Sequence, residues 1–388
     1  MPLNFLNNLL LLAAAQGIFL TLLIFHKHNR QRANRYLGVL ILLYSILLLH
    51  LYFDEMFRYS NQTPQLTICL IGLGFLVPPL HYLYARRLIF PAQKLSKTVW
   101  IHGLPLILYE LVCLPLVFQS KDRVLEHLNK HSLNGLPADY VFYDCLMIAV
   151  IFFYMIRTLI MLNRYAHHIR DLYSSIEKIR LTWLRNITYF AIVLAGVFLI
   201  ENILLIFNIR LFYYFGLSSI LAAVYVYAMG YMGLYKTEIF SAPGLTPVEE
   251  EWPSTDRTEK KYGKSGLSSK KADEIRRALL QLMETKQPFV DPEINLQQLA
   301  DLLSVTPHNL SEIINTQLHK NFFDFVNHYR IEKIKQDILD PNKSNFTLLA
   351  LALDAGFNSK TAFNTVFKKF TGLTPSQFKQ STADNPSS

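Results

Sequence analysis

Hydrophobic and polar positions follow two different patterns along the chain. The first 240 residues contain long apolar runs, each close to the length of about 20 residues that a membrane-spanning helix needs. A helix in a soluble bundle needs a polar face, and a stretch such as Leu37–Leu49 has almost none. The pattern therefore predicts seven membrane-spanning helices, the third of them kinked at Pro78-Pro79. The runs are Leu3–Phe25, Tyr36–Phe53, Leu66–Phe90, Trp100–Phe118, Val141–Leu162, Ile187–Phe207 and Tyr213–Tyr235.

After Ser268 the apolar positions recur at the spacing of short amphipathic helices. The first such helix places apolar residues on one face over 275–283. Asn295 and Gln298 then have the spacing of a capping box, which predicts a helix start between them. Thr306-Pro307 has the residue types of an N-cap and a first helical position, which predicts another helix start.

Two pairs of these helices have the pattern of a helix-turn-helix. In the first pair, the small Ala300 lies where two helices would cross, and a tight turn follows at Ser304. Ala352 and Gly356 repeat the arrangement 52 residues later. The helix predicted over Phe323–Leu339 would be about 25 Å long. With its flanks it could hold two recognition helices about 34 Å apart, which is one turn of B-DNA.

The stretch between the two patterns is rich in Pro, Gly, Ser and Glu and predicts a flexible linker over 241–269. A chain of that length has an end-to-end distance of roughly 30 Å. We therefore expect an all-α protein: a seven-helix transmembrane sensor domain over 1–240, the linker, and a cytoplasmic domain over 270–388. This last domain would contain two helix-turn-helix units joined by a connecting helix.

Charge separates the two halves as well. The formal net charge is +9, and all of the excess lies in residues 1–240, because residues 270–388 contain 14 basic and 13 acidic side chains. The loops after the first, third and fifth runs, counted with Arg86 and Arg87 at the end of the third run, carry 13 Lys and Arg, and the loops after the second, fourth and sixth carry 5. Positively charged loops stay in the cytoplasm. This predicts a multi-pass protein of the inner (cytoplasmic) membrane, with its N-terminus outside and its C-terminal domain in the cytoplasm.

Residues from about 270 to 381 resemble the DNA-binding domain of the AraC/XylS family of bacterial transcription regulators. The stretch from Ala355 to Ser359 and the residues around Gly372-Leu373-Thr374-Pro375 are similar to the family signature near its second helix-turn-helix. Asn327–Ile331 resembles the start of the family's connecting helix. The chain departs from the pattern at Ser304, where many members have Gly.

The resemblance implies that the second helix of each pair enters the major groove of double-stranded DNA. Asn can pair there with adenine, Lys with guanine and Glu with cytosine. The implied base contacts are His308, Ser311, Glu312, Asn315, Lys360, Thr361, Asn364 and Thr365. The implied phosphate contacts are Lys320, Arg330, Lys368 and Lys369. The alternative for each is an ordinary solvated surface charge, and for Glu312 a solvated helix face is as good an explanation, because its carboxylate would repel phosphate.

Polar residues inside the apolar runs are candidates for a signal site, because such residues are costly in a bilayer. His81, Glu110 and the neighbouring pair Glu201-Asn202 are the residues we single out. Hydrogen bonding between helices for packing alone is the alternative.

The chain shows no nucleotide-binding, hydrolase or metal-binding motif, so we expect no enzyme, no cofactor and no metal site. The sequence predicts a membrane-anchored one-component transcription regulator whose partners are DNA, the lipid bilayer, a signal ligand of unknown identity and RNA polymerase. A homodimer through the membrane half and release of the DNA-binding domain by proteolysis in the linker are two ways in which it could be controlled. The alternative function is a membrane receptor or transporter whose helical domain docks proteins rather than DNA.

Overall fold

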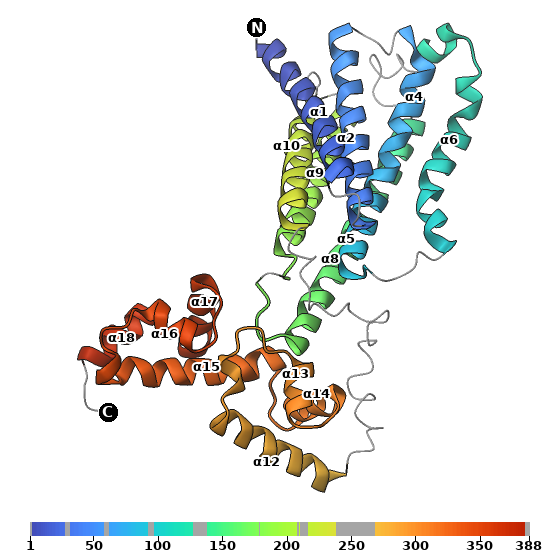
Figure 1. Cartoon of the computed structure of the whole chain (residues 1–388). Coiled ribbons are helices and arrows are strands. Elements are labelled where there is room, and N and C mark those ends of the chain that lie inside the picture. Colours follow the sequence, from blue (N-terminus) through green and yellow to red (C-terminus); the bar gives the residue numbers. More distant parts are fainter. Residues whose placement is uncertain are drawn as a thin grey trace. The chain divides into compact units, whose positions relative to one another are not determined.

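The computed structural model describes residues 2–27, 32–57, 62–91, 97–126, 138–177, 179–207, 209, 216–237 and 268–384. Most of the predicted linker therefore lies outside the described residues. The chain divides into two compact units (Figure 1). Unit 1 comprises Met1–Asn163 and Leu181–Glu250, and unit 2 comprises Arg164–Arg180 and Glu251–Ser388.

Unit 1 is a bundle of long apolar helices, among which α2 packs against α1, α5 and α10. Seven helical stretches in the described part of the chain are long and apolar enough to cross a membrane. They coincide with the seven runs predicted from the sequence. The elements are α1 (Pro2–Lys27), α2 (Arg32–Phe57), α4 (Pro64–Gly72), η1 (Leu73–Leu76), α5 (Val77–Ile89), η2 (Lys97–Gly103), α6 (Leu104–Val117), α8 (Ala138–Leu172), α9 (Thr182–Ile206) and α10 (Leu217–Thr237).

The third stretch is interrupted, as the two prolines predicted, but just before them. α4 ends at Gly72, one 3₁₀ turn follows, and α5 begins at Val77 with Pro78-Pro79 in its first turn. Proline is tolerated in the first turn of a helix, because the amide groups there have no intrahelical acceptor. The interruption of the α-helix therefore falls in the four residues of η1.

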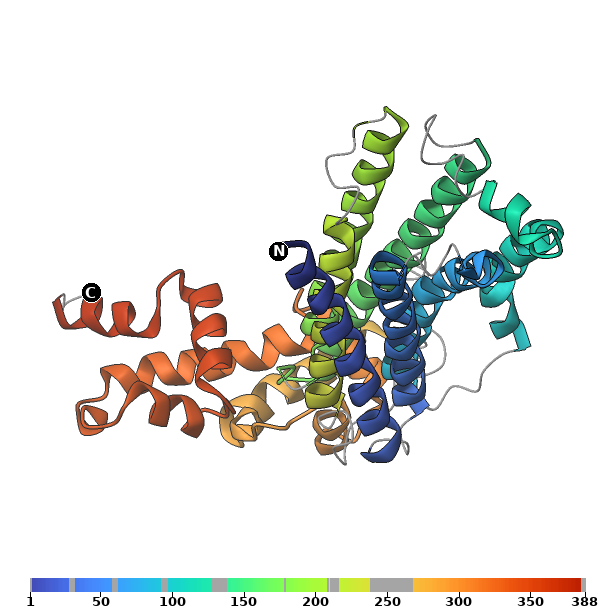
Figure 2. The same cartoon turned by 90° about the horizontal axis from the view of Figure 1, so that it is seen from above.

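Unit 2 has two groups of short helices at the two ends of one longer helix, α15 (Phe322–Leu339) (Figures 1 and 2). One group is α12 (Ser269–Thr285), η5 (Pro288–Val290), α13 (Leu296–Leu302) and α14 (Pro307–Thr316). The other is η6 (Pro341–Lys343), α16 (Leu348–Asp354), α17 (Lys360–Thr371) and α18 (Pro375–Asp384). The described residues contain no strand, which confirms the all-α prediction.

Side-chain caps start several of these helices, and the first two below lie where the sequence predicted. Asn295 and Gln298 form a capping box at α13, and Thr306 caps α14. Asn321 caps α15 and Ser359 caps α17. Each cap satisfies an amide group that has no acceptor within its helix. α18 was not among the predicted helices, although Thr374 and Gln377 have the capping-box spacing and form both reciprocal hydrogen bonds.

Candidate nucleic-acid interface

The first helix-turn-helix, here the first motif, consists of α13 and α14. Ala300 is fully buried where the two helices cross, so that their backbones approach closely. The amide of Val305 donates to the carbonyl of Ala300 and closes the turn. Ser304 has a φ of 54°, in the left-handed region that favours glycine. A residue other than glycine therefore occupies the strained position of this turn.

The second motif consists of α16 and α17 and has the same construction. Ala352 is fully buried, and the amide of Phe357 donates to its carbonyl. Gly356 has a φ of 95°. A β-carbon on Gly356 would collide with the carbonyl oxygen of Phe289 and would lie 2.9 Å from that of Val290. Glycine is required here both for its dihedral angle and for the close approach of η5.

α17 divides cleanly into a buried apolar face and an exposed polar face. Phe363, Val366 and Phe367 are at most 4% exposed and anchor the helix. The four base candidates of this helix are all exposed on the other side: Lys360, Thr361, Asn364 and Thr365. An open groove of about 480 Å³ runs from this face to the start of α18, lined by Asn364, Thr365, Lys368, Lys369, Thr374, Pro375 and Ser376. Thr374, Pro375 and Ser376 were not among the site residues predicted from the sequence.

α14 is anchored in the same way, by Leu310, Ile313 and Ile314, but its polar face is less accessible. His308 is exposed, whereas Ser311, Glu312 and Asn315 are half-buried. The amide nitrogen of Asn315 donates to the carbonyl oxygen and the hydroxyl of Ser311. Asn315 would have to give up these hydrogen bonds in order to read a base.

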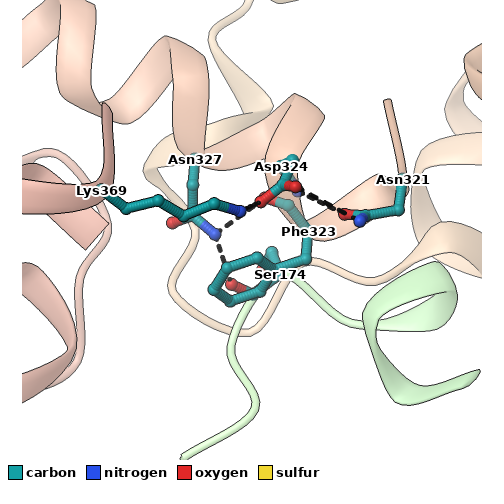
Figure 3. A network of polar contacts seen from close by, with 6 residues as sticks. All are labelled: Ser174, Asn321, Phe323, Asp324, Asn327 and Lys369. Atoms are coloured by element: carbon teal, nitrogen blue, oxygen red, sulfur yellow. Dashed lines mark hydrogen bonds and ion pairs between the residues drawn. The ribbon is translucent and has the colours of Figure 1, made fainter. Parts of the chain in front are cut away.

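The predicted phosphate contacts fall into three situations. Lys368 is exposed and Lys320 is half-buried. Lys369 is exposed but forms an ion pair with Asp324 of α15 (Figure 3). A phosphate would therefore compete with a carboxylate for Lys369.

Arg330 is not a phosphate contact, which corrects the prediction. Its side chain is 1% exposed, and its five N–H donors all point at acceptors inside unit 2. Nε donates to the carbonyl of Phe289 at 2.8 Å, and Nη2 donates to that of Asp291 at 2.8 Å. Burial lowers the pKa of the guanidinium to about 10, so the group remains charged at neutral pH. The sequence alone suggests that a long cationic side chain contacts DNA. In the structure, however, all the N–H donors of this guanidinium are used within unit 2.

The four signal candidates lie in unit 1 and do not form one cluster. His81 of α5 is fully buried, with its ring nitrogens 2.6 Å from the hydroxyl of Tyr225 and 3.0 Å from that of Thr188. Glu201 lies 13 residues beyond Thr188 on α9, or about 20 Å along the helix. Its carboxylate accepts from the amide and the hydroxyl of Ser218 at the start of α10.

The other two candidates make different contacts. Glu110 of α6 lies against Gly72 of α4. The amide nitrogen of Asn202 donates to the carbonyl of Phe198, one turn earlier in α9. These side chains therefore have separate partners on different helix pairs, and a signal site that uses Glu110, Glu201 and His81 stays a prediction.

Comparison with known proteins identifies the C-terminal part of the chain. Residues 299–381 match the family model described as a helix-turn-helix domain, and this part is an AraC-type helix-turn-helix domain. An uncharacterized HTH-type transcriptional regulator of Staphylococcus aureus (strain COL) is 32% identical over 87 residues, which are 22% of this chain and 11% of that protein. No solved structure matches the chain significantly. The family match lies within unit 2 and is to a DNA-binding domain, not to a catalytic family.

Proposed function

We propose that the chain is a membrane-anchored, sequence-specific transcription regulator that reads double-stranded DNA with α17 and α14. The observation that carries the proposal is the exposed polar face of α17 in a domain that matches a DNA-binding family. Lys360, Asn364 and Thr365 have the chemistry to contact base edges, and Lys368 can contact the phosphate backbone. In α14, His308 and Ser311 are the corresponding base contacts.

Membrane anchoring is supported by the surface of unit 1. Large apolar side chains are exposed along its helices, for example Trp100 at 86%, Leu12 at 64% and Val193 at 58%. A soluble protein rarely exposes continuous apolar surface of this kind, whereas lipid would cover it. We place the protein in the cytoplasmic membrane with its N-terminus outside, on the basis of the basic loops. The further partners in this proposal are a signal ligand, a second copy of the chain and RNA polymerase.

The proposal is tested by genome-wide DNA occupancy of the full-length protein in its membrane. We expect discrete enriched sites, and we expect the double variant Lys360→Ala/Asn364→Ala to lose them while it remains in the membrane fraction. Lys270→Ala is the matched control, because Lys270 is exposed on α12 outside both motifs. If the unmodified protein occupies no more DNA sites than the double variant, DNA binding is contradicted and a protein-docking domain is favoured.

A further inference from the structure

Unit 2 contains a segment that belongs, along the chain, between the fifth and sixth apolar helices. The described residues of this inserted segment, Arg164–Arg180, form the last turns of α8 and a short connection of bends and turns that leads to α9. Within unit 2 it packs into the DNA-binding domain. Leu172 lies against the core of the first motif, and Ser174, Ile176 and Ile179 are at most 5% exposed.

Ser174 is the centre of the contact. Its hydroxyl donates to the carbonyl of Ile294 at 2.7 Å, just before α13. Its carbonyl accepts from the amide nitrogen of Asn327 at 3.0 Å (Figure 3). The same carbonyl accepts from Nη1 of Arg330 at 3.4 Å. Nη2 of Arg330 donates to the Ser174 hydroxyl at 3.2 Å. The inserted segment therefore supplies part of the acceptor set that makes the burial of the Arg330 charge tolerable.

The contacts around Ser174 and Arg330 also connect the two motifs. Arg330 donates to the backbone of η5 beside the first motif, and its guanidinium carbon lies 5.7 Å from the ring centre of Phe357 in the turn of the second. Asn358 in that turn donates to the hydroxyl of Ser175 at 2.6 Å. Tyr173 forms an isolated antiparallel bridge with Asn295, the cap of α13. Residues 173–175 thus contact the first motif, the connecting helix α15 and the second motif at once.

We propose that the inserted segment is an internal effector of the DNA-binding domain. When the segment is bound in this way, it fixes the two motifs relative to each other, and this preorganisation raises the affinity of the domain for DNA. When the segment is withdrawn, Arg330 loses the acceptors that Ser174 provides, and the affinity for DNA falls. The polar face of α17 is exposed in the docked arrangement, so docking does not block reading. The segment is covalently joined at both ends to apolar helices. A rearrangement of those helices would therefore act directly on the contacts of Ser174 and Ser175 with the DNA-binding domain. This inference rests on the proposed DNA-binding function.

The experiment uses the full-length chain, with Cys69, Cys113 and Cys145 replaced by alanine. Paired residues of an antiparallel bridge have Cα atoms about 4.5–5.5 Å apart, which a disulfide can span. Tyr173→Cys with Asn295→Cys should therefore cross-link on mild oxidation in membranes. Tyr173→Cys with Ser381→Cys, on exposed α18, is the control and should not. Absence of the first cross-link would overturn the inference.

The second arm measures DNA affinity with a duplex taken from the occupied sites. Ser174→Ala/Ser175→Ala removes three hydrogen bonds to the dock without changing any residue of 268–384. Because one such bond is worth about fivefold in an equilibrium and three are removed, we expect the double variant to lose between about fivefold and about 100-fold in affinity. His167→Ala, an exposed substitution on the same segment, should lose none.

The discriminating readout is rescue. In the Ser174→Ala/Ser175→Ala background, oxidation of the 173–295 cysteine pair should restore the affinity, and reduction should remove it again. Equal affinity in the locked and released forms would overturn the inference while DNA binding itself stands. If the pair cross-links and no form binds DNA, the proposed function fails and the effector role fails with it.

Discussion

The two motifs of the DNA-binding domain share one construction and differ in what they expose. The second motif has glycine in its turn and lysines along an open recognition face. The first has serine in the strained position of its turn, and a glutamate and an internally bonded asparagine on a half-buried face. Since charge supplies much of the affinity for DNA and base contacts supply the selectivity, we expect the second motif to anchor the protein and the first to refine its choice.

The largest effect should come from the turn of the second motif. Gly356→Ala adds a β-carbon against the carbonyls of η5 at a positive φ, and we expect it to cost about 3 kcal/mol of unfolding free energy. Gly372→Ala is the matched control, because φ there is 77° but nothing lies within 4 Å; it should cost about 1 kcal/mol. Hydrogen exchange of the amides of α16 and α17 in the full-length protein measures both. Equal costs would show that the contact with η5 contributes nothing.

Removing charge from the second motif should weaken binding to every DNA sequence. We expect Lys368→Ala/Lys369→Ala to lower affinity by about tenfold at moderate salt, and each substitution to reduce the slope of log affinity against log salt by at most about 1. Anisotropy titrations of the solubilised full-length protein at several salt concentrations give both numbers. Lys270→Ala should leave the slope unchanged. An unchanged slope in the double variant would mean that the anchor lies elsewhere.

Neutralising Glu312 should make the first motif more similar to the second in its affinity for the DNA backbone. Glu312→Gln removes a carboxylate that repels phosphate, and we expect a gain of about threefold in affinity that shrinks as salt is raised. The same titrations measure it, with Asp301→Asn on α13, outside the recognition helix, as the control. A loss of affinity would instead indicate that Glu312 contacts a base, by accepting a hydrogen bond from the amino group of cytosine.

The smallest effect should be a gain in stability. Ser304→Gly relieves a φ of 54° at the first turn, and we expect about 0.5 kcal/mol after the greater freedom of glycine in the unfolded chain is subtracted. Hydrogen exchange of α13 and α14 reads this out, and Ser304→Ala should change little, because alanine has the same strain. A loss of stability would show that the serine side chain contributes to the turn.

Local physics explains which features the sequence could predict. The seven apolar helices, the capping box at Asn295 and the turn at Gly356 each depend on residues close together in the chain, and the structure contains all of them. The role of Arg330 could not be predicted, because its acceptors come from residues 174, 289 and 291. No local pattern in a basic loop between two apolar runs indicates that Ser174 would dock on the connecting helix.

The local partners of the signal candidates could not be predicted either. His81 and Glu201 are both polar residues inside apolar runs, and hydropathy alone treats them alike. His81 contacts Tyr225 and Thr188, and Glu201 contacts the start of α10. These partners lie far away in the sequence, so no local pattern indicates them, and the signal site stays a prediction.

The non-contiguity of unit 2 affects how the domain can be cut or isolated. A peptide bond broken anywhere in 241–267 would leave residues 164–180 attached to the apolar helices, so the two products would still meet through the contacts of Ser174 and Ser175. Cleavage alone would therefore break the chain without releasing its C-terminal domain. A recombinant piece beginning at Ser268 would lack one surface of its own interior, and a synthetic peptide of residues 164–180 added in trans should complement it.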